Sequence, residues 1–256
     1  MAVAERFSLD GQVALTIGGT SGIGREIALG FSDAGATIVT VSRTPEKVER
    51  TVKEIEAAGG TAQGHVADVR DIDQIRELVA KVIADHGRID TLLNSQGVTR
   101  LKPSQEFTEE DYDFILDTNL KSVFFCSTEV GKHMIERGSG SMINIASLSS
   151  YRGWSNSCLY SLSKFGVVSL TETLACEWAQ RGVRVNGIAP GFFMTDLNKE
   201  RMPQARKEHA IARTPMGRFG ELDELVGAAI FLASPAAKYV TGETIRVDGG
   251  YLAMGI

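Results

Sequence analysis

The chain has 256 residues, of which 43% are hydrophobic and 23% charged, and a formal net charge of −5 at pH 7. This length and composition predict a globular protein with a large buried core. The negative charge argues against a nucleic-acid-binding surface and against an anionic membrane, and no run approaches the roughly 18 apolar residues of a membrane helix. The first twelve residues have no apolar core, so we expect no secretory signal and a cytoplasmic protein.

The cysteines and histidines predict neither disulfides nor a metal site. Cys126, Cys158 and Cys176 are odd in number, widely spaced and inside helix-like segments, which favours reduced, buried thiols. The four histidines share no metal-ligand spacing with each other or with the cysteines.

The first strong pattern is an apolar run at residues 13–17, followed by glycines and a helical pattern to residue 34. Between them lie Gly18, Gly19, Thr20, Ser21, Gly22, Ile23 and Gly24. A strand, a glycine turn and a helix start place free N–H groups and a positive dipole end near a phosphate. The spacing G-x-x-x-G-x-G differs from the common G-x-G-x-x-G fingerprint. Such clusters are often only turns, but the strand–helix context favours a dinucleotide site.

The second apolar run, residues 37–41, ends in Ser42 and Arg43. In a dinucleotide-binding fold, an acidic residue here bonds the ribose hydroxyls of NAD, whereas an arginine accommodates the 2′-phosphate of NADP. The chain has no acid at this point. We therefore expect NADP(H) to be favoured, with NAD(H) as the alternative and a solvated loop charge as the plainer role for Arg43.

Strand and helix patterns then alternate along the chain. We expect helices at about 47–58, 71–86, 109–137 and 160–180, and strands at 61–66, 89–93, 142–146 and 183–189. This alternation predicts βαβ units and a parallel sheet in one domain, residues 1–256. Ligands of such sheets bind beyond the carboxyl ends of the strands. The residues just past those ends are predicted to share one cleft: Gly18, Asp68, Asn94, Ser147 and Pro190.

Tyr160 and Lys164 are four residues apart, so a helix places them on one face. A phenol titrates near pH ~10, and an adjacent ammonium lowers that pKa towards the range useful for acid–base chemistry. Ser147 follows a strand, so its hydroxyl would lie at the carboxyl edge of the sheet. Alone, this pair is more often a partly buried tyrosine beside a surface lysine.

Taken together, the motifs resemble those of the classical short-chain dehydrogenases/reductases over essentially the whole chain. They run from Gly18-x-x-x-Gly22-x-Gly24 through Asp68, Asn94-x-x-Gly97, Asn119, Ser147, Tyr160-x-x-x-Lys164, Pro190-Gly191 with Thr195, to Val247-Asp248-Gly249-Gly250. The resemblance implies an α/β, Rossmann-type, doubly wound domain with a mostly parallel seven-stranded sheet flanked by helices. It also implies an NAD(P)(H)-dependent oxidoreductase that interconverts a secondary alcohol and a ketone.

By this resemblance, Tyr160 is the general acid–base, and Lys164 lowers the pKa of Tyr160 and holds the nicotinamide ribose. Ser147 polarises the substrate oxygen, and Asn119 helps hold a water in the proton relay. The turn from Gly18 to Gly24, with Thr20, Ser21 and Ile23, would hold the cofactor beside Ser42 and Arg43. Asp68 and Val69 would contact the adenine, Asn94 and Gly97 the adenosine side, and Pro190, Gly191 and Thr195 the nicotinamide end.

Two positions depart from the family pattern. Ile17 replaces the threonine usual before the first glycine, and Ser95-Gln96 replaces Asn-Ala in the motif at Asn94. We expect these changes to alter cofactor packing rather than abolish catalysis.

The substrate-shaping segments of the family carry mostly polar and basic residues here. These are Arg100, Arg152, Trp154, Asn156, Lys199, Arg201, Arg206 and His209, with a mobile lid expected at about 192–213. They favour a sugar acid, polyol or similar small polar substrate, and the sequence is closer to gluconate 5-dehydrogenases than to steroid enzymes. A 3-oxoacyl-thioester reductase is the alternative, and a non-catalytic dinucleotide-binding scaffold is a second one.

Family members are commonly tetramers. We expect a homotetramer that pairs the helices around Asn119 and Tyr160, with residues 167–170 and 251–256 available for burial.

Overall fold

The computed structural model describes residues 2–195 and 202–254. Its centre is a seven-stranded sheet in the order β3-β2-β1-β4-β5-β6-β7, and all neighbouring strands run parallel. The strands are β1 (Val13–Ile17), β2 (Thr37–Ser42), β3 (Ala62–Val66), β4 (Thr91–Asn94), β5 (Gly140–Ile145), β6 (Val183–Pro190) and β7 (Thr244–Val247). The predicted doubly wound α/β fold is confirmed.

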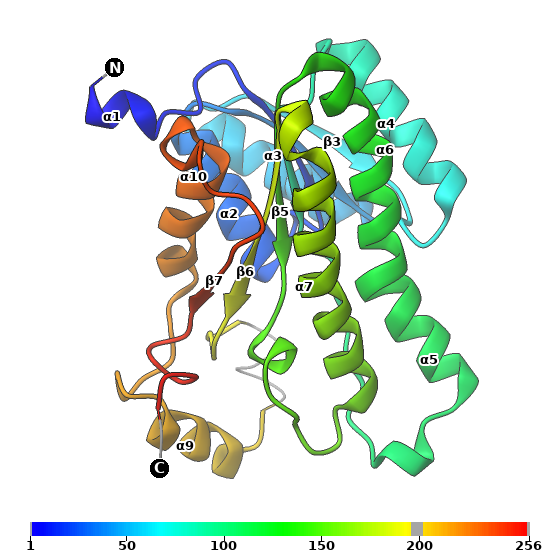
Figure 1. Ribbon diagram of the computed structural model, residues 1–256, viewed down its shortest axis with the longest axis vertical. Helices are drawn as coiled ribbons and strands as arrows, with labels where there is room; N and C mark the ends of the chain where they lie inside the picture. Colours follow the sequence, from blue (N-terminus) through cyan, green and yellow to red (C-terminus); the bar gives the residue numbers. More distant parts are fainter. Residues whose placement is uncertain (1, 196–201, 255–256) are drawn as a thin grey trace.

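Helices cover both faces of the sheet (Figure 1). The helices are α1 (Val3–Arg6), α2 (Gly22–Asp33), α3 (Pro45–Ala57), α4 (Ile72–His86), α5 (Glu109–Leu116), α6 (Ser122–Arg137), α7 (Cys158–Trp178), α9 (Gln204–Arg213) and α10 (Val226–Ala233). One core cluster joins the sheet to α4, α6 and α7, and the other joins it to α2, α3 and α10. Because both faces are covered, the central strands are rich in apolar residues, and every residue of β1 is buried.

The order of the strands reverses beside β1, because β2 lies on one side of it and β4 on the other. In such sheets the crevice beyond the carboxyl ends at this reversal is the ligand site. Gly18 follows β1, Asn94 ends β4, Ser147 comes two residues after β5, and Pro190 ends β6. The parallel register therefore brings the predicted site residues to one edge.

Some predicted boundaries were wrong. The segment 109–137 is not one regular α-helix: α5 is followed by a π-helical turn (Asp117–Lys121) before α6 begins. β4 begins at Thr91 rather than residue 89. The Asp90 carboxylate just before it accepts the Val13 N–H and is paired with Arg88 and Arg137.

The cysteine prediction was also partly wrong. Cys126 is buried, and burial raises the pKa of its thiol to about 12. Cys158 and Cys176 are exposed on α7, so only one of the three thiols lies in the core.

Within the described ranges, none of the helices has the length and apolar character needed to cross a bilayer.

Candidate active site

Ser147 lies where the chain leaves β5 and begins the short 3-10 turn Leu148–Ser150. Its hydroxyl oxygen accepts the Ser149 N–H at 3.1 Å, which fixes the side chain at the start of the turn. The Ser150 hydroxyl donates to the Lys164 carbonyl at 2.7 Å. This bond ties the turn to α7, the helix that carries Tyr160 and Lys164, so the three predicted catalytic residues are held by one local framework.

Lys164 is only 4% exposed, and its ammonium donates to the Ile145 carbonyl at 2.7 Å. Its Nζ lies 5.9 Å from the centroid of the Tyr160 ring. The helix therefore places both side chains on one face, as their spacing predicts. The alternative of a surface lysine is wrong for this chain.

Burial is the main influence on the pKa values of these two residues. Burial raises the pKa of Tyr160 above its ordinary value, and the nearby Ser147 hydroxyl opposes this shift. Burial also lowers the pKa of Lys164 from 10.5 to about 8. Desolvation dominates both shifts, and the Lys164 ammonium is bonded to the Ile145 carbonyl. A lowering of the pKa of Tyr160 by Lys164 stays a prediction.

Asn119 lies in the π-helical turn between α5 and α6 and is fully buried. Its Oδ1 accepts the Val98 N–H at 2.7 Å, and its Nδ2 donates to the Val98 carbonyl at 2.9 Å and to Ser163 Oγ at 3.1 Å. Ser163 in turn donates to the Tyr160 carbonyl at 2.7 Å. The Asn119 side chain therefore joins the loop after β4 to α7. Its part in a water relay stays a prediction.

Ser163 was not singled out in the sequence, although it stands one residue before Lys164. Gly97 completes this side of the site. A Cβ atom added to Gly97 would lie 3.6 Å from Lys164 Nζ and 3.8 Å from Asn119 Oδ1. The glycine thus brings backbone close to both predicted catalytic side chains.

The glycine turn after β1 fits a bound pyrophosphate. Gly18 has a φ of +75°, and a Cβ there would lie 2.9 Å from the backbone nitrogen of Gln96. A Cβ at Gly24 would meet the Gly18 carbonyl oxygen at 2.4 Å, so the turn closes only without side chains. Above Gly22 the space is open, with Thr195 Cγ2 the nearest atom at 3.8 Å. Ser21 caps α2 without a side-chain hydrogen bond, which leaves the first N–H groups of the helix available to an anion.

Thr20 and Ile23 anchor this turn to the interior of the protein. Thr20 is buried, and its carbonyl accepts from Arg50 at 3.4 Å. Ile23 packs against the core on the α2 side. Ile17, the first departure from the family pattern, is a buried core residue, and the turn is held instead by the Gly18 N–H bonded to the Val41 carbonyl at 2.9 Å.

Asn94 and Gln96 belong to a buried polar network rather than to an open wall. Asn94 Nδ2 donates to Ser127 Oγ at 3.0 Å and to Asn144 Oδ1 at 2.9 Å, so only its backbone is left for a ligand. Gln96 Nε2 donates to Ser122 Oγ at 3.0 Å. The larger side chain of Gln96 thus turns towards α6. The other replacement, Ser95, has its hydroxyl against Gly24.

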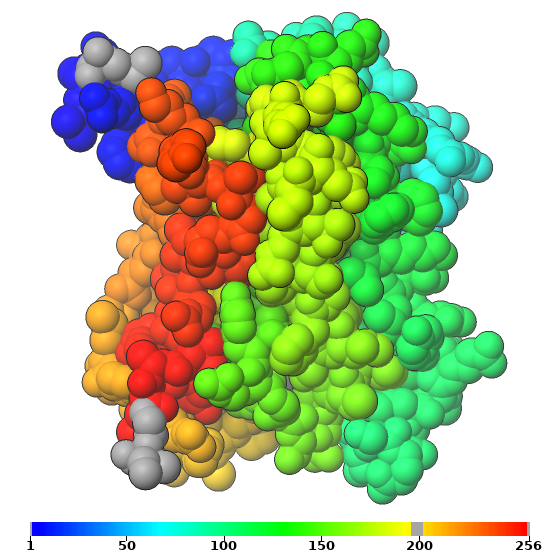
Figure 2. Space-filling view, viewed as in Figure 1, coloured from blue at the N-terminus to red at the C-terminus, as the bar shows by residue number. Residues whose placement is uncertain are grey.

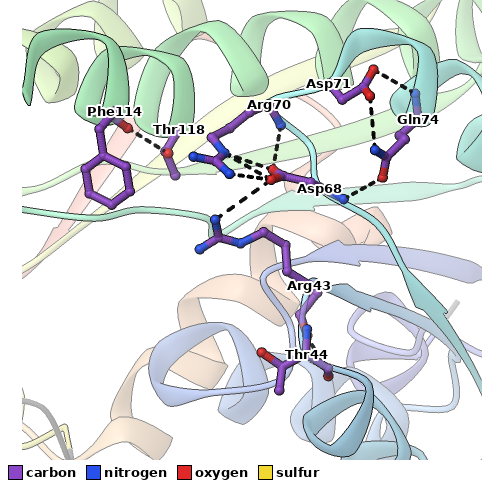
Figure 3. A network of polar contacts seen from close by, with 9 residues as sticks. Arg43, Thr44, Asp68, Arg70, Asp71, Gln74, Phe114 and Thr118 are labelled. Carbon is purple, nitrogen blue, oxygen red and sulfur yellow. Dashed lines mark hydrogen bonds and ion pairs between the residues drawn. The ribbon is translucent and has the colours of Figure 1, made fainter. Parts of the chain in front are cut away.

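The residues predicted to recognise the adenosine part of the cofactor include a charged network just past the ends of β2 and β3 (Figure 3). Arg43 Nη1 lies 3.9 Å from Asp68 Oδ2, and Arg70 bonds both oxygens of the same carboxylate. Ser42 Oγ is occupied locally by the backbone of Thr44. Val69 packs in the core, so only its backbone could meet an adenine. Arg70 was missed in the sequence, because nothing in its spacing shows which carboxylate it meets.

Pro190 is the buried last residue of β6, and the Gly191 N–H donates to the Val247 carbonyl at 2.8 Å. A Cβ at Gly191 would lie 2.6 Å from Asp248 Cα, which explains the small residue at this crossing. Thr195 approaches the glycine turn at Gly22. The expected lid falls partly outside the described residues, as do Lys199 and Arg201, and its movement stays a prediction.

The substrate side is more aromatic than the sequence indicated. Trp154 stacks on Tyr251, with ring centroids 5.8 Å apart, and meets Phe192 edge-on at 5.6 Å. Phe219 lies 5.9 Å from Phe192. The Nε1–H of Trp154 is buried and has no hydrogen-bond partner among the described residues. This cluster joins the segment before α7 to the chain after β6 and β7.

The basic side chains expected to line the substrate site are only partly free to meet a substrate. Arg100 and Lys102 both pair with the buried carboxylate of Asp111. Arg152 is exposed and donates to the Tyr151 carbonyl at 2.8 Å, and the Asn156 carbonyl accepts the Lys102 N–H at 2.9 Å. The remaining two, Arg206 and His209, are exposed on α9. A cavity of about 390 Å³ lies nearby, between the chain segments 192–193, 214–224 and 246–250, but no predicted catalytic residue lines it.

Comparisons with known proteins agree with this geometry. A family model described as enoyl-(acyl carrier protein) reductase matches residues 18–252. The 3-oxoacyl-(acyl-carrier-protein) reductase of Thermotoga maritima is 40% identical over 242 residues, which are 94% of this chain and 98% of that protein. The 2-dehydro-3-deoxy-D-gluconate 5-dehydrogenase of Escherichia coli is 40% identical over 253 residues, which are 98% of this chain and 99% of that protein.

Among solved structures, a gluconate 5-dehydrogenase from Burkholderia cenocepacia in complex with NADP and tartrate has a TM-score of 0.96 and 38% identity. The match covers 99% of this chain and 100% of that chain. The chain belongs to the short-chain dehydrogenase/reductase family. It is an NAD(P)-dependent oxidoreductase that acts on CH–OH groups.

Burial of the Lys164 ammonium predicts a pH dependence of the stability of the cofactor-free protein. Below pH 8 the amine is protonated in both the folded and the unfolded chain, so folding carries the full cost of burying the charge. Between about 8 and 10.5 the folded protein releases this proton first, and the cost disappears. The stability of Lys164→Met relative to the unsubstituted protein should therefore fall by about 3 kcal/mol across this range.

Urea unfolding at neutral pH and near pH 10.5 measures this difference. The Ile145 carbonyl loses its donor at both pH values, so that loss adds only a constant offset. Lys238→Met, at an exposed lysine, is the control and should show little change. An equal effect of Lys164→Met at both pH values would contradict the assignment.

Proposed function

We propose that this enzyme interconverts a secondary alcohol and a ketone on a sugar acid, a polyol or a similar small polar substrate, with NADP(H) as the preferred cofactor. The observation that carries the reaction is the convergence of Ser147, Tyr160 and Lys164 beside the glycine turn. The substrate class is supported by the relatives that act on gluconate derivatives and that match this chain from end to end.

The roles of the catalytic residues follow from their positions. When bound, the nicotinamide supplies or accepts the hydride at the substrate carbon. The Ser147 hydroxyl would hold the substrate oxygen at the edge of the sheet. The raised pKa of Tyr160 keeps its phenol protonated at neutral pH, so it can give a proton to that oxygen during ketone reduction. The Lys164 amine, whose pKa is about 8, would exchange a proton with this group and hold the ribose.

The cofactor would lie across the carboxyl edge of the sheet. The turn from Gly18 to Gly24 would hold its pyrophosphate, and Thr195 and Gly191 would meet its nicotinamide end. Arg43 supports the preference for NADP(H), because its guanidinium lies past the end of β2 and is about half exposed. NADP is bound in the Burkholderia structure.

A 3-oxoacyl-thioester reductase is the second candidate, since the Thermotoga maritima enzyme is as similar in sequence as the gluconate-type relative. In such a substrate the acyl chain is attached to an acidic carrier protein. Asp111 pairs with both Arg100 and Lys102 and cancels one of their two positive charges, which weakens the basic rim that this partner would need. A non-catalytic scaffold is not favoured, because all four predicted catalytic positions are filled.

A substrate panel tests the proposal. We expect purified protein to oxidise NADPH faster than NADH in the presence of a keto-sugar acid such as 5-ketogluconate, and to be slow with a 3-oxoacyl thioester. The measurement is the loss of reduced-nicotinamide absorbance. Activity with the thioester and with no keto-sugar would replace the first candidate by the second. If no substrate in the panel is turned over but the cofactor binds normally, the non-catalytic scaffold would be favoured.

The Tyr160→Phe variant tests the proton-transfer step. Removal of one hydroxyl keeps the ring packing but takes away the proton donor, so we expect turnover to fall by about 10²- to 10⁴-fold. Cofactor affinity, measured by nicotinamide fluorescence, should change little. Tyr239→Phe, at a fully exposed tyrosine, is the matched control and should keep normal activity. Normal turnover of Tyr160→Phe would contradict the mechanism.

We also propose a cytoplasmic homotetramer. Support comes from exposed apolar side chains on adjacent helices: Tyr112 on α5, Phe124 on α6, and Leu162 and Phe165 on α7. Figure 2 shows α7 along its length on the open surface of the molecule. Val167 is a buried core residue, so this part of the expected interface is not available.

Light scattering at micromolar protein concentration measures the assembly. We expect the mass of four chains, and Phe165→Asp should lower it, because a charge would then lie in a buried apolar contact. Tyr239→Asp, at a fully exposed site outside α5, α6 and α7 in the sequence, should leave the mass unchanged. A single-chain mass for the unsubstituted protein would refute the tetramer.

A further inference from the structure

The carboxylate of Asp68 is held by Arg70. Arg70 Nε donates to Oδ1 at 3.0 Å and to Oδ2 at 3.1 Å, and Nη2 donates to Oδ2 at 2.5 Å. The backbone N–H of Arg70 adds a bond to Oδ1 at 3.1 Å. A carboxylate bonded by a guanidinium fork and a backbone amide has both oxygens occupied by its own neighbour in the chain.

The position of Asp68 does not depend on Arg43. The Asp68 N–H donates to Gln74 Oε1 at 2.9 Å, and Gln74 Nε2 donates to Asp71 Oδ2 at 3.0 Å. Asp71 caps α4 through the N–H groups of Asp73 and Gln74. The start of α4 and the end of β3 thus fix the carboxylate, as Figure 3 shows.

Arg43 approaches the same carboxylate from the other side, but its Nη1 lies 3.9 Å from Asp68 Oδ2, beyond hydrogen-bond distance. The side chain of Arg43 is 49% exposed, compared with 37% for Arg70 and 28% for Asp68. Of the two cations, Arg43 is therefore the one that is more weakly held and more open to a ligand.

The charges of the three groups explain why this arrangement matters. Two guanidiniums and one carboxylate leave a net positive charge, which attracts a phosphate. Without Arg70, the carboxylate would be the strongest partner within reach of Arg43, and the pair would be neutral. It would also repel a phosphate dianion placed beside it.

We propose that Arg70 is a positioning residue for cofactor selection: it occupies Asp68 and so leaves Arg43 available to the 2′-phosphate of NADP(H). This inference rests on the NADP(H) preference of the proposed function. It assigns Arg70 a role through Asp68 and not through contact with the phosphate.

The test uses two fragments of the cofactor, 2′,5′-ADP and 5′-AMP, which differ only in the 2′-phosphate. Their dissociation constants are measured by calorimetry on the full-length protein at low ionic strength, and the ratio reports recognition of that phosphate. We expect Arg70→Ala to reduce the preference for 2′,5′-ADP about tenfold, because Asp68 then captures Arg43. The double variant Asp68→Asn/Arg70→Ala should restore it, because an asparagine does not neutralise Arg43.

Arg76→Ala is the control, since Arg76 lies on α4 and pairs with Asp73 and Glu129 instead of Asp68. It should keep the ratio of the unsubstituted protein, and thermal unfolding checks that each variant is folded. An unchanged ratio in Arg70→Ala would overturn the inference, and so would a double variant as weak as Arg70→Ala, because Arg70 would then contact the phosphate itself. An unsubstituted protein without any preference for 2′,5′-ADP would instead refute the NADP(H) preference.

Discussion

The carboxyl edge of the sheet depends on one constraint: burying a polar side chain there is costly unless it keeps a hydrogen-bond partner. Lys164 meets it by donating to the Ile145 carbonyl, and Asn119 meets it through Val98 and Ser163. The Lys164 bond joins α7 to β5, and the Asn119 bonds join the π-helical turn to the loop after β4 and to α7. Together they hold β5, α7, the π-helical turn and the loop after β4 in one arrangement.

The same burial sets the acid–base properties of the site. Desolvation disfavours the charged form of both groups, so it raises the pKa of the Tyr160 phenol and lowers that of the Lys164 amine. Both groups hold their protons at neutral pH. A protonated phenol suits reduction of a ketone, whereas oxidation needs the phenol to lose its proton first.

The sequence predicts the fold well because the local patterns agree with the tertiary structure. The apolar runs at residues 13–17 and 37–41 became the largely buried strands β1 and β2, and parallel pairing brought Gly18, Ser147 and Pro190 to one edge. The features that the sequence does not predict depend on contacts between distant segments. The π-helical turn at Asn119 accompanies bonds to Val98 and Ser163, and the aromatic contact between Trp154 and Tyr251 joins segments almost a hundred residues apart.

The charged residues show the same limit most clearly. Reading Arg43 alone predicts phosphate recognition, and reading Asp68 alone predicts adenine recognition, but the two lie close enough to neutralise one another. Whether Arg43 is available to a phosphate depends on Arg70, because the guanidinium of Arg70 already occupies the Asp68 carboxylate. Cofactor preference in this fold is therefore a property of the charge balance among neighbouring strand ends. A single residue after β2 indicates it only when the partner of each nearby charge is known.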